Sequence, residues 1–307
     1  MAKKYKTELH SAWIVGKINA DEIEKLAEAG FEGVESTATG LDTTLEEARE
    51  ARKICEANGL KIHSVMRSLS FNSPDFGEAA LKAHRHGLQI AAAYGAATAL
   101  CVPGRVDAPP VSPKDLQIEF DPETLELKSI GADSDAAQAY IKAQNEATRA
   151  VQKHMPEVLK VAAYEGIRIC LENVWNNLWL SPEFYAAFIH SFDSPWLGSY
   201  FDLGNHVKYS RTENWLRALG KGTIFKLHLK DFLYQPDEGA LGRFVPVGKG
   251  TNDWKLIRDV LEEIEYNGFV TIEFEEGESR QLSLAAHARK FRNFFNGEDI
   301  LAGIEEN

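Results

Sequence analysis

The sequence predicts a (β/α)8 TIM barrel, in which eight parallel strands close into a ring and each strand is followed by a helix. Short apolar runs alternate with longer helical patterns eight times along the 307-residue chain, and about 250 residues is typical of this fold. The runs are continuously apolar, as expected for a parallel sheet covered by helices. No glycine-rich phosphate turn follows an early strand, which disfavours the competing doubly wound sheet.

The first four units carry clear helix boundaries. Asp21 stands near the start of the first helical pattern and Gly30 at its end, as helix caps require. The second pattern closes at Asn58 and Gly59, and the third closes at Gly95. The predicted strands are 10–16, 31–36, 60–66 and 97–104, and the predicted helices are 19–30, 43–59 and 74–95.

Residues 105–133 fit no strand–helix unit. They contain a Pro-Pro pair, many charges and a possible β-hairpin. We interpret them as an insertion after the fourth strand, on the catalytic side of a single domain spanning residues 1–307. Long loops of this kind are often functional, but a flexible insertion is an equal alternative.

The second half of the chain completes the eight units. A Ser-Pro pair at 181–182 marks the start of one of its helices. The predicted strands are 167–173, 197–205, 224–231 and 269–277, and the predicted helices are 134–166, 181–192, 214–220, 252–268 and 279–295.

The composition is that of an ordinary soluble globular protein, with 44% hydrophobic and 26% charged residues. The net charge of -12 argues against nucleic acid as a partner. No apolar run approaches the ~20 residues that cross a membrane. Cys55, Cys101 and Cys170 are far apart in apolar surroundings, which predicts buried, reduced thiols and a cytoplasmic protein. A trimmed export signal is the alternative for its location.

Four predicted strands bring a charged or ligating side chain to their carboxyl ends. Glu172 ends "ICLEN", Asp202 ends the apolar part of "YFDLGN", Glu273 ends "VTIEF", and His228 lies in "FKLHLKD". The carboxyl ends of barrel strands converge on one mouth. Three carboxylates there would repel one another unless a cation neutralised them. One imidazole among oxygen ligands suits Mn²⁺, Mg²⁺ or Co²⁺. Taken singly, each carboxylate also fits a helix cap or a salt bridge.

These segments resemble the xylose isomerase-like TIM barrels, which include sugar phosphate isomerases and epimerases, ketose 3-epimerases and inosose dehydratases. The resemblance covers nearly the whole chain outside residues 105–133, and is most specific in "CLEN", "FDLGN", "LHLKD" and "VPVGKGTNDWKLIRDVLEEIEYNGFVTIEFE". It implies one divalent metal ion, with Mn²⁺ first among the candidates, held by Glu172, Asp202, His228 and Glu273. It further implies that Glu172 and Glu273 are the acid/base pair of an isomerase or epimerase that works through an enediolate.

The resemblance also indicates substrate-binding candidates, with departures from the family pattern. Ketose 3-epimerases carry a histidine three residues after the aspartate ligand, where this chain has Asn205, followed by His206. Lys230 follows His228 by two residues, which is more similar to the dehydratase and pentulose-phosphate epimerase branches. It could hold a substrate oxygen or phosphate, or form a salt bridge. His63, at the end of the third strand, is expected to reach the substrate or to be structural.

The sequence leaves several functions open. A metal-dependent lyase or dehydratase of a keto-sugar or inosose would use the same site. A non-catalytic sugar-binding barrel is a weaker alternative, because fold does not fix function. An endonuclease is disfavoured by the acidic charge and by a fourth strand without histidine. We expect a small-molecule carbohydrate substrate, and a homo-oligomer would be compatible with the sequence.

Overall fold

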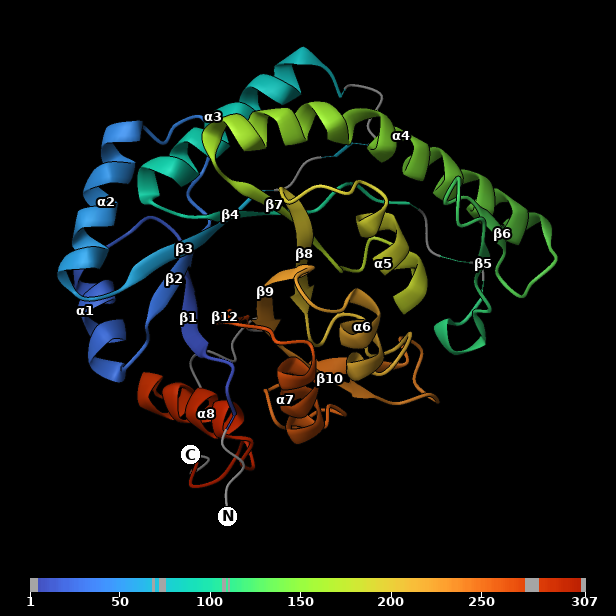
Figure 1. The fold of residues 1–307 in the computed structure, drawn as a ribbon. Coiled ribbons are helices and arrows are strands. Elements are labelled where there is room, and N and C mark those ends of the chain that lie inside the picture. Colours follow the sequence, from blue (N-terminus) through green and yellow to red (C-terminus); the bar gives the residue numbers. More distant parts are fainter. Residues whose placement is uncertain are drawn as a thin grey trace.

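Eight parallel strands form a closed barrel in the computed structural model of the protein, which describes residues 5–67, 70–71, 76–106, 109, 111–273 and 282–304 (Figure 1). The strand order around the ring is β1-β12-β9-β8-β7-β4-β3-β2, and β2 pairs with β1 to close it. This architecture confirms the predicted fold class. The barrel strands are β1 (Leu9–Val15), β2 (Gly33–Ser36), β3 (Lys61–Met66), β4 (Thr98–Cys101), β7 (Arg168–Glu172), β8 (Leu197–Asp202), β9 (Ile224–Leu229) and β12 (Gly268–Ile272).

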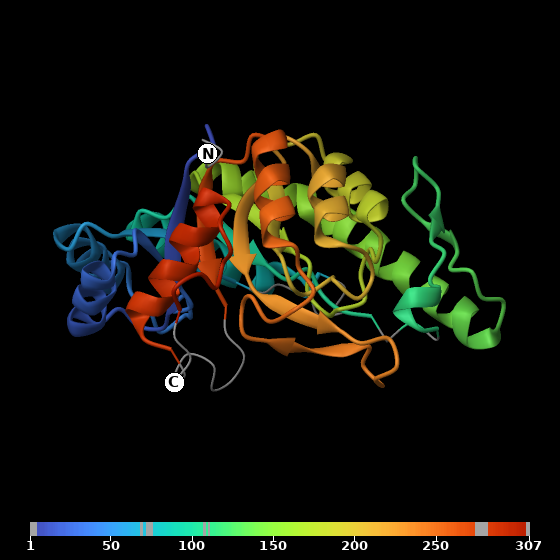
Figure 2. The same ribbon diagram turned by 90° about the horizontal axis from the view of Figure 1, so that it is seen from below.

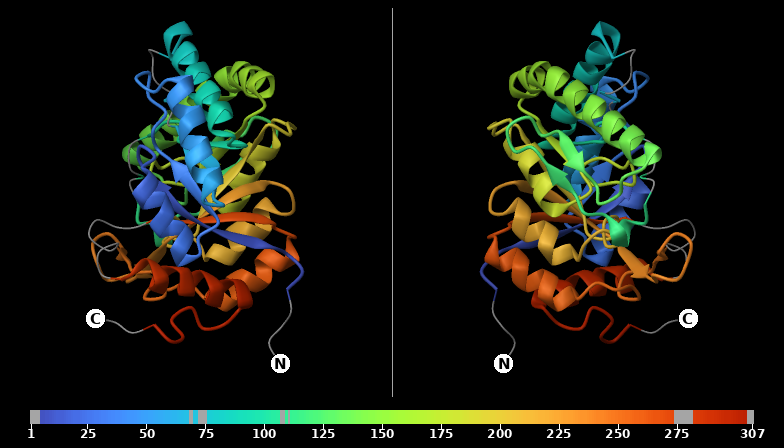
Figure 3. Two further views of the ribbon diagram at one scale, coloured as in Figure 1. Left: turned by 90° about the vertical axis from the view of Figure 1, so that its left-hand side faces the viewer. Right: turned by 90° about the vertical axis from the view of Figure 1, so that its right-hand side faces the viewer.

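A helix follows each barrel strand and packs on the outside of the ring, as Figure 3 shows from two sides. Gly30 and Gly95 end their helices in the left-handed conformation, with φ of 93° and 77°, as the sequence predicted. The first helix is capped by the Asn19 side chain, two residues before the predicted Asp21. The helices are α1 (Ala20–Ala29), α2 (Leu45–Ala57), α3 (Glu78–Tyr94), α4 (Asp135–Glu165), α5 (Pro182–His190), α6 (Thr212–Leu219), α7 (Trp254–Glu263) and α8 (Leu284–Asn296).

The insertion after β4 contains a short 3-10 helix, η1 (Pro113–Asp115), and a hairpin of β5 (Glu119–Phe120) and β6 (Leu127–Ser129). The hairpin packs on α4, where the Asn145 side chain exchanges hydrogen bonds of 2.7 and 3.1 Å with the backbone of Leu127. Figures 1 and 2 place β5 and β6 beside the outer end of α4, away from the barrel strands. The hairpin therefore lies to the side of the barrel.

A second hairpin, formed by β10 (Asp231–Tyr234) and β11 (Gly242–Val245), was not predicted. The sequence assigned residues 224–231 to one strand, but β9 ends at Leu229 and the chain turns into β10. Asp231 stands at this turn, and its Oδ2 accepts hydrogen bonds from Gly248 N at 3.0 Å and Gly250 N at 2.9 Å, which tie the segment after β11 to the start of β10. Burial raises the pKa of Asp231 to about 6. The hairpin follows the carboxyl end of β9 directly and thus stands at the mouth of the barrel.

The main core lies between the strands and the helices, and Leu100, Cys170 and Tyr200 form a smaller separate cluster inside the barrel. Cys55, Cys101 and Cys170 are all free and buried, which confirms the predicted buried thiols. Among the described residues, no helix combines the length and apolar character needed to cross a bilayer.

Candidate metal centre

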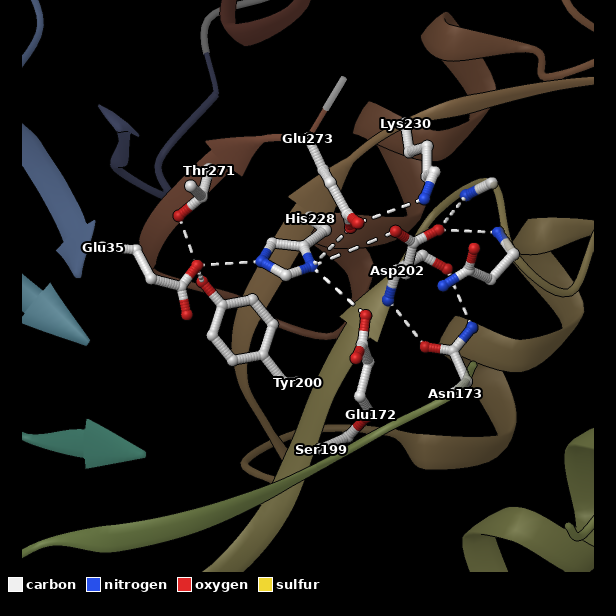
Figure 4. A network of polar contacts seen from close by, with 12 residues as sticks. Glu35, Glu172, Asn173, Ser199, Tyr200, Asp202, His228, Lys230, Thr271 and Glu273 are labelled. Carbon is white, nitrogen blue, oxygen red and sulfur yellow. Dashed lines mark hydrogen bonds and ion pairs between the residues drawn. The ribbon is translucent and has the colours of Figure 1, made fainter. Parts of the chain in front are cut away.

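Glu172, Asp202, His228 and Glu273 meet at the carboxyl end of the barrel (Figure 4). Each offers one ligand atom, and these four atoms all lie within 4.8 Å of one another. The first three side chains are buried, and Glu273 is 24% exposed. Sequence reasoning predicted these four residues, and the structure brings all of them into one small volume.

Strand register explains why the side chains converge. Asp202 of β8 pairs with His228 of β9, and His228 also pairs with Thr271 of β12. Residues paired in register point to the same face of the sheet, and residues two apart along a strand share a face. Glu273, two residues after Thr271, therefore points inward beside His228. Glu172 ends β7, the neighbour of β8.

Asp202 is held in one orientation by its backbone surroundings. Its Oδ1 accepts hydrogen bonds from Gly204 N at 2.8 Å and Asn205 N at 2.6 Å. Asn173 exchanges two further hydrogen bonds with the Asp202 backbone, at 2.6 and 2.9 Å. A Cβ on Gly204 would lie 2.9 Å from the carbonyl carbon of Lys230, so this tight turn requires glycine. The turn leaves Oδ2 of Asp202 aimed at the cluster.

Three ligand-type atoms of the cluster are buried without a hydrogen bond: Asp202 Oδ2, Glu273 Oε2 and His228 Nδ1. His228 Nδ1 lies 3.1 Å from Glu273 Oε2, 3.4 Å from Glu172 Oε1 and 4.0 Å from Asp202 Oδ2. Buried polar atoms normally have a partner, so their convergence here fits a shared cation. The donor set of three carboxylates and one imidazole is suitable for a divalent metal ion.

The electrostatics of the cluster agree with a site that exchanges a cation for protons. Burial raises the pKa of Asp202 to about 8, and burial likewise raises the pKa of Glu172. Burial alone would lower the pKa of His228, but the surrounding carboxylates, Glu35 first, raise that pKa well above its usual value. Burial alone would raise the pKa of Glu273 too, but its polar contact with His228 and the charges of His228 and Lys230 lower that pKa. Protons held by the other ligand side chains must leave when a metal ion binds.

Lys230 lies beside the cluster as part of an ion pair. Its Nζ donates a hydrogen bond to Glu273 Oε1 at 3.2 Å and stands 4.6 Å from the ring centre of Phe244 in β11. This is the salt bridge that the sequence left as the alternative to a substrate contact. The pairing leaves Lys230 at the mouth, where it borders the space beside Glu273.

Sequence reasoning missed an aromatic cluster at the mouth, because two of its members belong to the unpredicted hairpin. Phe244 packs on Trp175 in a tilted arrangement with ring centres 4.8 Å apart, and the ring centre of Phe232 lies 5.3 Å from that of Phe244. Lys208 places its Nζ 3.2 Å from the ring centre of Trp175. Among the described residues Lys208 has no carboxylate partner, and burial lowers its pKa to about 8.

The three remaining substrate-binding candidates are placed differently from Lys230. His206 is 2% exposed, packs on Trp215 with ring centres 4.8 Å apart, and its Nε2 donates to Val174 O at 3.2 Å. Burial lowers its pKa to about 3. The backbone of Asn205 supports Asp202 and accepts a hydrogen bond from Trp175 Nε1.

His63 lies inside the barrel, below the cluster. It is 4% exposed, its ring stacks on Phe269 at 4.3 Å, and its Nε2 is 3.0 Å from Thr271 Oγ1. This burial and these contacts fit the structural alternative that the sequence left open for His63.

The fold and the site together define a parallel eight-stranded barrel with a cluster of three carboxylates and one imidazole at the carboxyl ends of its strands. The chain belongs to the xylose isomerase-like TIM barrel family, whose sequence pattern matches residues 23–294. This membership confirms the resemblance inferred from the four strand-end motifs.

A curated relative is the L-ribulose-5-phosphate 3-epimerase UlaE of Escherichia coli O1:K1 / APEC, which is 25% identical over 167 residues. The match spans 54% of this chain and about half of the relative, 56% of its length.

Solved structures share the fold. A D-tagatose 3-epimerase-like protein aligns with a TM-score of 0.65 at 16% identity, covering 93% of this chain and 96% of its own. The IOLI protein with a bound zinc atom aligns at 0.66 and 14% identity, covering 93% and 96%. The probable 3-DHS dehydratase AsbF from Bacillus anthracis aligns at 0.64 and 14% identity, covering 92% and 99%.

Proposed function

We propose that the protein is a divalent-metal-dependent epimerase or isomerase of a ketose or ketose phosphate. The observation that carries this proposal is the approach of two glutamates to one edge of His228. Glu273 Oε2 and Glu172 Oε1 lie 3.1 and 3.4 Å from His228 Nδ1, and Figure 4 shows the two carboxylates converging on this nitrogen from two different strands. Two carboxylates that flank one binding position suit the removal of a proton from one face of a carbon and its return to the other.

The four residues named above would hold the metal ion, with Mn²⁺ as the first candidate and Mg²⁺ or Co²⁺ as alternatives. When bound, such an ion supplies positive charge that stabilises an enediolate formed from the substrate. Glu172 and Glu273 would carry the proton between the two faces of the reacting carbon. Asp202 and His228 would hold the centre in place, because both are fully buried and fixed by hydrogen bonds to other residues.

The mouth also offers positive charge for an anionic substrate. Lys208 and Lys230 stand on two sides of the aromatic cluster, over Trp175 and Phe244 respectively. The ammonium group of Lys208 has no carboxylate partner among the described residues and is therefore suited to bind a phosphate group. The name of the curated relative, a ketose-phosphate epimerase, supports the same choice. We therefore infer that a ketose phosphate is the better substrate class to test first.

The deciding experiment is incubation of the metal-loaded protein with ketoses and ketose phosphates in D₂O. Deuterium at carbon with the substrate's atoms otherwise retained supports epimerisation or isomerisation, and the position of the label separates the two. An unsaturated product with loss of water would establish the lyase alternative instead. Bound cation without turnover of any tested ketose would overturn the proposed activity.

Variants of the glutamate pair locate the activity. E172Q and E273Q should each abolish label exchange, because either change removes one partner of the proton transfer. E213Q is the matched control, since Glu213 on α6 is also buried, at 6% exposure, but pairs with Arg211 just before that helix. Full exchange in E172Q or E273Q would contradict the assigned roles.

A further inference from the structure

Glu35 is a buried carboxylate in β2 that lies against the ligand histidine. It is 0% exposed, and its Oε2 is 2.8 Å from His228 Nε2 and accepts a hydrogen bond from Tyr200 OH at 2.8 Å (Figure 4). Its other oxygen, Oε1, is buried without a hydrogen-bond partner. A carboxylate that is buried with half of its acceptor capacity unused is expensive for folding, which indicates a role beyond packing.

The hydrogen bonds around Glu35 can be given a direction. Tyr200 has one hydroxyl proton, and it is used toward Glu35. The contact of 3.0 Å between Tyr200 OH and Thr271 Oγ1 must therefore be donated by the threonine. Thr271 Oγ1 is then the acceptor in its 3.0 Å contact with His63 Nε2. Every proton in the chain from His63 to Tyr200 points toward Glu35.

His228 completes the arrangement from the opposite direction. A carboxylate oxygen can only accept, so His228 Nε2 carries a proton and donates it to Glu35 Oε2. The second ring nitrogen, Nδ1, is then the atom left to face Glu172, Asp202 and Glu273. Hydrogen bonds that share a direction strengthen one another in a buried environment, which applies to those from His63 to Tyr200. His228 and Tyr200 are two separate donors to the same oxygen of Glu35 and hold this carboxylate from two sides.

We propose that Glu35 is a positioning residue that sets the tautomer, orientation and donor strength of His228, and that Tyr200, Thr271 and His63 support it as a one-way hydrogen-bond chain. The inference rests on the metal centre of the proposed function. A carboxylate behind a ligating imidazole increases the basicity of the ligating nitrogen and prevents rotation of the ring. His63 thus acts on the metal centre through three other side chains, without touching substrate.

The test is the affinity for Mn²⁺, measured by competition with a chromogenic chelator in the absence of substrate. E35Q keeps the size of the side chain but removes its charge, and should weaken Mn²⁺ binding about 10- to 100-fold. Y200F leaves Glu35 in place and removes one hydrogen bond to it, and should weaken binding about 2- to 10-fold. T271V should have a smaller effect than Y200F.

The control for a lost buried hydroxyl is Y140F. Tyr140 is 4% exposed and donates to Asn177 O at 2.8 Å from α4, outside the chain of hydrogen bonds. Y140F should lower the melting temperature without changing Mn²⁺ affinity. The visible absorption spectrum of bound Co²⁺ supplies a second measurement, and E35Q should shift it while Y140F leaves it unchanged.

Wild-type affinity in both E35Q and Y200F would overturn the inference, and so would losses that Y140F reproduces. Should E35Q not fold, Y200F carries the test alone, because it retains the carboxylate. Failure of the wild-type protein to bind any divalent cation would overturn the metal centre itself. Normal cation binding by the wild type together with an unaffected E35Q would overturn only the role of Glu35.

Discussion

Replacement of Gly204 by alanine should damage the metal centre without touching a ligand. The added Cβ would lie 2.9 Å from the carbonyl carbon of Lys230, 3.0 Å from its oxygen and 3.1 Å from the amide nitrogen of Asp231. These are backbone atoms and cannot rotate away, so one of the two segments must move by several tenths of an ångström. Gly204 N supports Asp202, and Lys230 supports Glu273, so either movement displaces a ligand.

The magnitude follows from the contact. Overpacking of this kind costs about 1–3 kcal/mol. With an unfolding entropy of about 2.1 cal/mol/K per residue, that lowers the melting temperature by roughly 2–5 °C in a chain of this length. Displacement of one ligand should also reduce Mn²⁺ affinity by about 10-fold or more.

Differential scanning calorimetry and chelator competition measure the two effects on the same samples. G239A is the matched control, because a Cβ on Gly239 meets nothing within 4 Å. The G204A protein should melt earlier and bind Mn²⁺ more weakly than G239A. If G204A matches G239A in both respects, the turn after β8 does not position Asp202 in the way described.

Three further outcomes are expected. Treatment with EDTA should stop label exchange and lower the melting temperature, and Mn²⁺ should restore both; activity that survives chelation would refute metal dependence. K208M should raise KM for a ketose phosphate about 10-fold or more while leaving the free ketose unchanged, since a charge-assisted hydrogen bond contributes about 1.5–3 kcal/mol; equal effects on both substrates would argue against a phosphate contact. Burial lowers the pKa of His84 to about 3 from 6.5, so its neutral form stabilises the fold above pH 6.5 and that contribution is lost as the pH falls. Between pH 7 and pH 5 the loss is about 2 kcal/mol, and H84L should lose correspondingly less in urea titrations; identical pH dependence in both proteins would contradict this.

The fold and the ligand candidates were predictable because their signals are local. An apolar run that ends in Glu172, Asp202 or Glu273 is visible without knowledge of any contact, and barrel topology then places the three ends together. His228 required only its position in the seventh predicted strand. Each of these inferences needed the type of element and its direction, which periodicity and helix caps supply.

Glu35 could not be predicted in the same way. It stands inside "FEGVES", a short run that also contains the exposed Glu32, and nothing local separates the two carboxylates. Its importance comes from Tyr200 and His228, which are 165 and 193 positions away. The sequence likewise left open whether His63 contacts substrate or is structural, because its neighbours Phe269 and Thr271 lie far along the chain.

The β10–β11 hairpin was missed because its first strand follows β9 almost directly, in "HLKDFLY", without a glycine or proline to mark the turn. The three-dimensional structure shows that Asp231 binds the backbone of Gly248 and Gly250, which brings the end of the hairpin back to its start. The aromatic cluster of the mouth depends on this turn, so it too was beyond local reasoning.

The four ligand candidates all project from the consecutive strands β7, β8, β9 and β12, and the segments after β1 to β4 provide none of them. Lys208 and Lys230, which are proposed to hold a substrate phosphate, follow β8 and β9 in this same half of the ring. The proposed reactive centre and its anion contacts thus share one half of the barrel, so changes in the segments after β1 to β4 would leave both in place.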